Sequence, residues 1–265
     1  MTPTNQFIFP FGQILNPVVQ TDVSPKKVFV LGVYASAVHA RWNDKDGNQL
    51  VAALAVASEP EIFWTGHDTQ LQIDKIAIPE EAGKLVLPNV NLNGPSGRAL
   101  DELYLKPLGL TRKDAWLCDL IPETRLNPHQ KNAIIRSYKP LMKNFNLPKV
   151  TIPEFRQGEL TTEQRRQEIL KELFDSHAET LILLGDLPIK WFLNYFSDTK
   201  NRTLASFGET PESYGLAHKM KIDGKTFSVI PLCHPRQAQR LGASSKNWFD
   251  LHRNWVKKKN ALPGK

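Results

Sequence analysis

A histidine stands where a buried strand is expected to end, directly before a proline. The apolar run at residues 227–233 stops at His234-Pro235, and Arg236 and Arg240 follow closely. Proline restricts the backbone just beyond the imidazole, and arginines attract phosphate groups. An imidazole at the end of a strand is a candidate functional group. The same pattern also fits a strand-end histidine that is packed under a loop.

A carboxylate lies near the end of a second apolar run, residues 115–121. This residue is Asp119. In open parallel sheets, ligands bind at the carboxyl ends of the strands, so Asp119 and His234 are the two chemistry-bearing side chains expected at that edge. An ionised carboxylate can only accept hydrogen bonds. Two roles therefore remain open for Asp119: it reads a ligand, or it turns away and ties down the loop of residues 124–127.

Other kinds of site find little support. The segment "GVYASAVHARW" contains a serine but lacks the G-x-S-x-G turn of the α/β hydrolases, and we assign no nucleophile. No His, Cys and Asp spacing predicts a metal site, so we expect neither a metal nor a cofactor. A hydrolase or nucleotide-binding enzyme of another family would need a nucleophile turn or a glycine-rich phosphate loop, and neither is found.

The elements that must position these residues form an alternating pattern. Near-continuous apolar runs suit strands that are buried on both faces, and helical patterns lie between the runs. We therefore predict a three-layer α/β/α sandwich around a central, mostly parallel, four-stranded sheet. Residues 47–58 fit either a helix or a strand. The four expected strands are residues 26–33, 115–121, 180–186 and 227–234, and the helical patterns are residues 96–110, 127–145, 161–177 and 186–196.

Composition favours a single globular domain over residues 1–265. The formal net charge is +7, and residues 246–265 carry six Lys or Arg and one acidic residue. Such a basic end attracts phosphate backbones or acidic partners. No run is long enough for a membrane span, and no signal peptide is recognised. Cys118 and Cys233 lie in apolar runs and are expected to be reduced core thiols. We expect a cytoplasmic monomer with no membrane partner.

Five motifs, in this order along the chain, resemble those of the uracil-DNA glycosylase superfamily, most closely its bacterial and archaeal iron–sulfur type. The likeness covers about residues 28–256, with an insertion at about 151–177 and a basic tail at 257–265. The motifs are the turn in "VFVLGVYASA"; "NGPSGRALDELYLKPLGLTRKD", with Gly94, Ser96, Gly97, Leu100, Asp101, Gly109, Leu110 and Arg112; "AWLCDLIPETRLNPHQ", with Asp119 at the family's Asn position; "LILLGDLPIKWFL"; and His234-Pro235 before a helix that contains Trp248.

The resemblance implies a glycosylase that flips a damaged or non-standard base out of single- or double-stranded DNA and excises it, as in base-excision repair. It places His234 at the O2 atom of the base, where negative charge develops. The alternative is a catalytically inactive nucleic-acid or nucleotide-binding member of the same fold. The implied base pocket is Gly32, Val33, Tyr34, Leu92 and Asp119, and the implied DNA contacts are Arg236, Gln237, Arg240, Ser244, Ser245 and Lys246.

Three departures from the family pattern qualify these expectations. Residues 33–35 are Val-Tyr-Ala, so the turn lacks the family's water-activating carboxylate or amide, and His39, Asn91 or Asn93 would have to replace it. The cluster cysteines are missing, so no iron–sulfur group is expected. Asp119 replaces an Asn that pairs with uracil, and a carboxylate suits an exocyclic amine better. The expected substrate is therefore not plain uracil.

Overall fold

A computed structural model describes residues 6–156, 158, 160–241 and 246–261. Its contacts divide the chain into two compact units, and the chain passes between them several times. The single domain expected from the sequence stays a prediction, because units joined by several crossings can still fold together. The first unit comprises Met1–Val18, Tyr34–Pro95 and Pro122–Gln157, and the second comprises Val19–Val33, Ser96–Ile121 and Gly158–Lys265.

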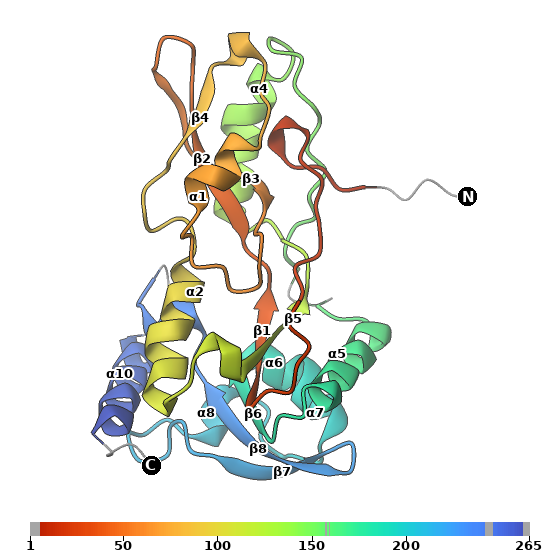
Figure 1. The fold of residues 1–265 in the computed structure, drawn as a ribbon, viewed down its shortest axis with the longest axis vertical. Coiled ribbons are helices and arrows are strands. Elements are labelled where there is room, and N and C mark those ends of the chain that lie inside the picture. The colour runs from red at the N-terminus through yellow and green to blue at the C-terminus, as the bar shows by residue number, and fades with distance from the viewer. Residues whose placement is uncertain (1–5, 157, 159, 242–245, 262–265) are drawn as a thin grey trace. The chain divides into compact units, whose positions relative to one another are not determined.

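The second unit is built on a five-stranded sheet with the order β5-β1-β6-β8-β7 (Figure 1). Strands β1, β6 and β8 run parallel, while β7 pairs antiparallel with β8 at one edge. All seven residues of β5 are buried, and β6 is buried over its last four residues. These strands are β1 (Val28–Tyr34), β5 (Ala115–Ile121), β6 (Thr180–Leu184), β7 (His218–Ile222) and β8 (Lys225–Leu232).

The four apolar runs identified in the sequence correspond to β1, β5, β6 and β8, and the α/β class is confirmed. The four-strand count was wrong because β7 was missed. Its burial alternates along the chain, as an edge strand's does. The hairpin signal was present: Asp223-Gly224 forms the turn to β8, with φ of 45° and 82°, as Asp-Gly turns between antiparallel strands commonly do. The resemblance to the uracil-DNA glycosylase fold stays a prediction.

Helices flank this sheet. Figure 1 shows α10 and α2 grouped at one side and α5 at the other. Helix α5 begins at the cap residue Thr162, whose side chain accepts a hydrogen bond from Arg165 N–H, and it packs on β5. A helical turn, η3 (Leu100–Leu105), continues α2. The helices are α2 (Pro95–Ala99), α5 (Glu163–Asp175), α6 (Asp186–Pro188), α7 (Asn194–Phe196), α8 (Leu204–Phe207), α9 (Pro235–Ala238) and α10 (Lys246–Asn260).

The first unit contains a three-stranded antiparallel sheet with the order β3-β2-β4. Residues 47–58, which fitted helix or strand, are mostly β3. Helix α3 follows the Asn127-Pro128 cap as expected, because the Asn127 side chain accepts two main-chain N–H groups. The elements are β2 (Ala37–Asn43), β3 (Gln49–Ser58), β4 (Lys84–Val86), α1 (Thr69–Asp74), α3 (Pro128–Ala133) and α4 (Lys139–Leu141).

An aromatic cluster fills the core of the first unit. Phe11 makes edge-to-face contacts with Trp42 and Tyr138 at ring-centroid distances of 5.2 and 5.3 Å. The Tyr138 hydroxyl accepts a hydrogen bond from Phe11 N–H and donates one to the carbonyl of Pro148. In the second unit, Cys118 and Cys233 are buried free thiols. None of the helices within the described part of the chain has the length and apolar content to cross a membrane.

Candidate functional site

His234 lies two residues beyond the end of β8 and caps the short helix α9. Its ring atom Nδ1 accepts a hydrogen bond from the main-chain N–H of Arg236 at 3.3 Å. The main-chain N–H of His234 donates to Gln237 Oε1 at 2.9 Å. In a neutral imidazole, one ring nitrogen accepts and the other carries the proton. The proton of His234 therefore resides on Nε2, which makes that atom a hydrogen-bond donor.

The imidazole of His234 is neutral at physiological pH. Burial and, to a smaller degree, the positive charge of Arg236 lower its pKa to about 4. Both effects disfavour the imidazolium form. The residue nevertheless keeps part of its surface exposed. His234 is therefore a neutral hydrogen-bond donor that a ligand can partly reach.

A glycine lets the end of β6 approach this histidine closely. Gly185 has φ of 93°, and a Cβ atom placed on it would lie 3.4 Å from His234 Cβ. Gly185 N–H donates to the carbonyl of Leu232 at 2.7 Å. A side chain at this position would be strained by the positive φ and would contact the histidine.

Asp119 lies near the end of β5 and is 5% exposed. Desolvation raises the pKa of its carboxyl to about 7, although the positive charge of Arg165 and a hydrogen bond from Val33 N–H both act to lower that pKa. Burial is therefore the dominant influence on its protonation. Near neutral pH, a large fraction of Asp119 carries a proton and can both donate and accept.

The strand register aligns these groups along one edge of the sheet. Leu31 is paired with Leu183, and Leu184 with Leu232. Two residues further along, the first register brings Val33 level with Gly185. One residue further along, the second register brings Gly185 level with Cys233. A row therefore runs from the Asp119 carboxyl through Val33 and Gly185 to His234. All of its members belong to the second unit.

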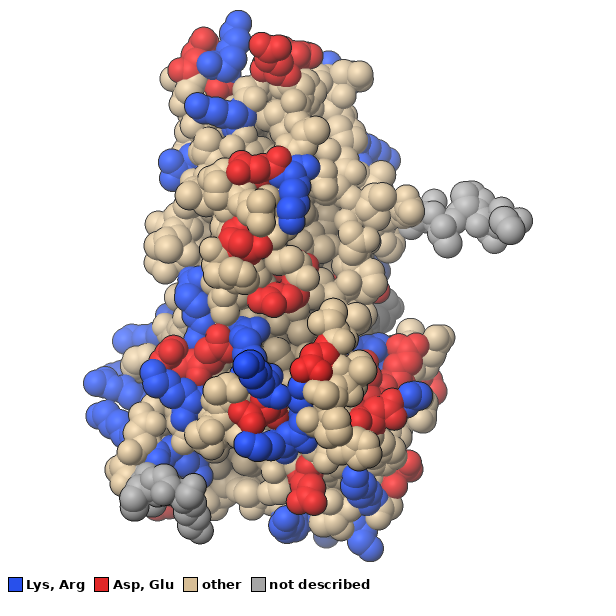
Figure 2. Space-filling view, viewed as in Figure 1, with Lys and Arg blue, Asp and Glu red and all other residues tan. Residues whose placement is uncertain are grey.

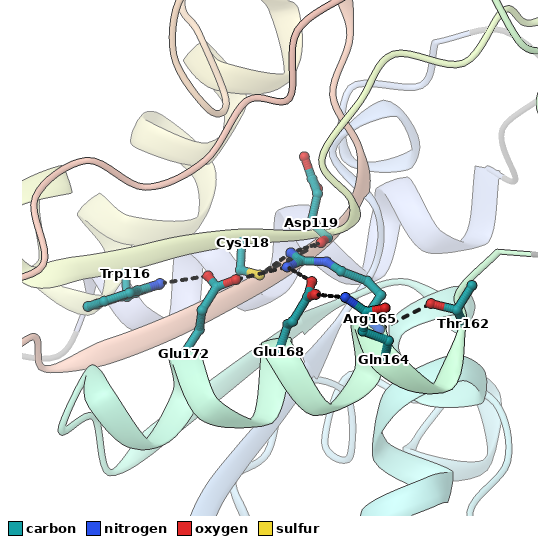
Figure 3. A network of polar contacts seen from close by, with 8 residues as sticks. All are labelled: Trp116, Cys118, Asp119, Thr162, Gln164, Arg165, Glu168 and Glu172. Carbon is teal, nitrogen blue, oxygen red and sulfur yellow. Dashed lines mark hydrogen bonds and ion pairs between the residues drawn. The ribbon is translucent and has the colours of Figure 1, made fainter. Parts of the chain in front are cut away.

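A guanidinium group braces the end of β5 from α5. Arg165 Nη2 donates to the main-chain carbonyl of Asp119 at 2.9 Å and contacts Cys118 Sγ at 3.3 Å. Its Nη1 pairs with Glu172 at 3.0 Å, and Glu172 also accepts from Trp116 Nε1 at 3.1 Å. Figure 3 shows the Asp119 side chain pointing away from Arg165 while its main-chain oxygen faces the guanidinium. The charge of Arg165 thus lowers the pKa of the Asp119 carboxyl although the two side chains form no ion pair.

Sequence reasoning did not find Arg165. It belongs to the segment that resembled an insertion, residues 151–177. An arginine seven residues before a glutamate, on one face of a helix, was the available signal. That signal is weak, because most such pairs lie on solvated surfaces.

The remaining expected pocket residues fall in different units. Gly32 and Val33 are buried in β1 of the second unit. Tyr34 and Leu92 belong to the first unit, where the ring of Tyr34 lies 5.1 Å from that of Phe155 and Leu92 is 36% exposed. A single pocket formed by all five residues stays a prediction.

The candidates for water activation also lie in the first unit. Asn93 and His39 are paired: Asn93 Oδ1 accepts from His39 N–H, and Asn93 Nδ2 donates to the His39 carbonyl. Burial lowers the pKa of the His39 imidazole, and its Nε2 lies 3.1 Å from Gln130 Nε2. Asn91 is exposed. Asn93 thus serves the local structure, and its role toward water stays untested.

Of the expected DNA contacts, Arg236 and Gln237 lie on α9, Arg240 lies two residues beyond it, and Lys246 begins α10. Arg236, Arg240 and Lys246 are exposed, whereas the Gln237 side chain is bound back to His234. Ser244 and Ser245 lie outside the described residues. Figure 2 shows Lys and Arg side chains gathered over α10 and α2. Exposed basic residues of α10 are Lys246, Arg253, Lys257 and Lys258.

Among the described residues, no group of three or more His, Cys, Asp or Glu side chains could hold a metal ion. Compared with known proteins, the chain matches no family model and no curated relative.

Proposed function

We propose that this chain is a DNA glycosylase-like enzyme that excises a damaged or non-standard base from DNA. The row of Asp119, Val33, Gly185 and His234 carries the proposal. Three strand spacings separate β5 from β8, on the order of 14 Å. The side chains of Asp119 and His234, pointing toward each other with one pyrimidine between them, would fill such a span. The row therefore suits a base held by a carboxyl on one side and an imidazole on the other.

The reaction would be hydrolysis of the N-glycosidic bond. The bond between C1′ and the base nitrogen breaks, its electron pair goes to the base, and a water oxygen bonds to C1′ while the water proton ends on the base. His234 Nε2–H would donate to the base O2, where charge builds. Such a donor contributes about 3 kcal/mol of transition-state stabilisation. A neutral imidazole can do this without giving up its proton.

The protonation state of Asp119 would decide which base is accepted. A neutral carboxyl donates from one oxygen and accepts at the other. It can therefore pair with uracil, at O4 and N3–H, or with cytosine, at N3 and the exocyclic amine. An ionised carboxylate repels the O4 atom of uracil, because both groups are hydrogen-bond acceptors. Uracil should consequently be accepted mainly below the pKa of Asp119, and amine-bearing bases over a wider pH range.

The second candidate is a nucleic-acid-binding protein of the same architecture without catalysis. One observation favours it: residues 33–35, at the end of β1, are Val-Tyr-Ala and offer no carboxylate or amide to activate water. Such a protein would bind DNA through α9 and α10 and would release no base.

A strand-cleavage screen separates the two candidates. Oligonucleotides with uracil, hypoxanthine, xanthine or a mismatched base are incubated with the protein and treated with alkali, which cuts the strand at each abasic site. We expect release of at least one base, a loss of about a hundredfold in His234→Ala, and no change in the exposed-histidine control His67→Ala. Asp119→Asn should increase uracil release at alkaline pH. DNA binding without base release would establish the second candidate.

A further inference from the structure

The peptide groups directly before His234 are held by two buried tyrosines. β8 ends at Leu232, so Cys233 has left the strand. Its N–H donates to the Tyr214 hydroxyl at 2.9 Å, and its carbonyl accepts from the Tyr104 hydroxyl at 2.7 Å. Tyr104 and Tyr214 are 0% and 3% exposed. The two hydroxyls replace the main-chain partners that the sheet no longer provides.

A histidine on α10 fixes the direction of these hydrogen bonds. His252 Nε2 lies 3.0 Å from the carbonyl of Leu103, which can only accept, so Nε2 carries the proton. His252 Nδ1 is therefore an acceptor, and the Tyr214 hydroxyl, 2.8 Å away, donates to it. The Cys233 N–H thus donates a hydrogen bond to the Tyr214 hydroxyl, and that hydroxyl donates one to His252 Nδ1. Burial lowers the pKa of His252 to about 4, which keeps this arrangement intact at neutral pH.

Packing holds α10 against the same loop. The indole N–H of Trp255 donates to the carbonyl of Gly215 at 3.2 Å. Gly215 has φ of 69°, and a Cβ atom there would lie 2.5 Å from the Trp255 ring. The ring of Tyr104 lies 4.4 Å from that of His252. Tyr104 of η3 and Tyr214 of the loop before β7 therefore converge on Cys233, and α10 packs behind both.

We infer that Tyr104, Tyr214 and His252 form a clamp that positions His234 for catalysis. The inference rests on the proposed role of His234. The three act through the main chain of Cys233 and are positioning residues. Gly185 limits His234 from the β6 side, and the clamp limits its backbone from the other side. An imidazole placed in this way keeps Nε2–H aimed at one point, and a shift of about 1 Å can cost a hundredfold in rate.

The test compares phenylalanine variants of matched tyrosines. Tyr214→Phe and Tyr104→Phe each remove one hydroxyl of the clamp. Tyr138→Phe removes a hydroxyl from the first unit that also makes two main-chain hydrogen bonds, so it controls for reduced stability. Single-turnover base release should fall about ten- to a hundredfold in Tyr214→Phe, with the DNA dissociation constant unchanged. Tyr138→Phe should release the base at the wild-type rate.

A second measurement does not depend on activity. The ring nitrogens of His234 are observed by long-range proton–nitrogen NMR, which distinguishes the two tautomers. The wild type and Tyr138→Phe should show the Nε2–H form, and Tyr214→Phe and Tyr104→Phe should show altered ring shifts. Unaltered shifts together with wild-type base release in both clamp variants would overturn the inference. If the wild type releases no base, the proposed function fails, and the NMR shifts decide about the clamp.

Discussion

At the residue scale, burial shifts both candidate groups toward their uncharged forms. Burial lowers the pKa of His234 to about 4 and raises that of Asp119 to about 7. In each case desolvation disfavours the charged form. A nucleobase is itself uncharged, so neutral donors and acceptors can pair with it without trapping an unpaired charge in a dry site.

The raised pKa of Asp119 predicts a pH-dependent stability. An unfolded aspartate titrates near about 4, so between about pH 4 and 7 the folded state binds the proton that the unfolded state has released. Stability therefore falls as pH rises through this window. From about pH 5 to pH 8, wild type should lose about 2 to 3 kcal/mol relative to Asp119→Asn.

Urea unfolding of both proteins at each pH measures this difference. His234 and His252 have lowered pKa values and act in the opposite direction, but the two proteins share them. Parallel pH dependence in wild type and Asp119→Asn would show that the carboxyl titrates normally.

Residue chemistry was only partly visible in the sequence. His234 and Asp119 could be identified because each ends an apolar run. The clamp could not, because Tyr104 and Tyr214 reach Cys233 across 129 and 19 residues. No local pattern marks a hydroxyl whose partner lies on another element.

At the element scale, prediction succeeded where burial is complete on both faces. β1, β5, β6 and β8 are continuous apolar runs, which leave a direct trace in the sequence. β7, β3 and β4 are partly exposed, so their patterns mix polar and apolar residues. β2 is mostly buried, but His39 and Arg41 interrupt its apolar run. The turn at Asp223-Gly224 was the clearest missed signal. The order of the strands depends on contacts between distant segments, and local patterns do not encode it.

Two strand-end glycines should respond differently to substitution. Gly185 and Gly224 both have positive φ, 93° and 82°, but only Gly185 approaches His234, whereas nothing lies within 4 Å of a Cβ on Gly224. Each change to Ala should cost about 1 to 2 kcal/mol of stability through backbone strain. Base release should fall more than about tenfold in Gly185→Ala and stay unchanged in Gly224→Ala. Equal activity of the two variants would show that strain at residue 185 does not reach His234.

Helix α5 should set the titration of Asp119 through Arg165. The guanidinium lowers the pKa of the carboxyl, so Arg165→Met should raise that pKa further, whereas Arg165→Lys retains the charge and should change it less. Carbon NMR of the Asp119 carboxyl across a pH titration gives the pKa directly. Arg165→Met should also destabilise the fold, because Glu172 loses its partner in a partly buried site. An unchanged pKa in Arg165→Met would show that α5 is purely structural.

At the scale of the whole molecule, the positive charge should govern affinity for DNA. The formal net charge is +7, and α10 presents Lys246, Arg253 and Lys257 at spacings of seven and four residues, which place them on one face. Each phosphate neutralised by a cation releases counterions. The logarithm of the association constant therefore falls linearly with the logarithm of salt concentration, with a slope of about −0.9 for each phosphate that the protein neutralises.

Replacing the three α10 residues by Gln should weaken DNA binding and make the salt slope shallower by up to about 2.7, which is about 0.9 for each phosphate that is no longer neutralised. The control replaces Lys45, Lys75 and Lys84, three exposed lysines of the first unit, with the same change in net charge. Fluorescence anisotropy with a labelled duplex and a labelled single strand, over a range of salt concentrations, measures both slopes. If net charge were sufficient, the two triple variants would bind alike. A shallower slope in the α10 variant means that the phosphates contact α10, the helix that packs on α9, which His234 caps.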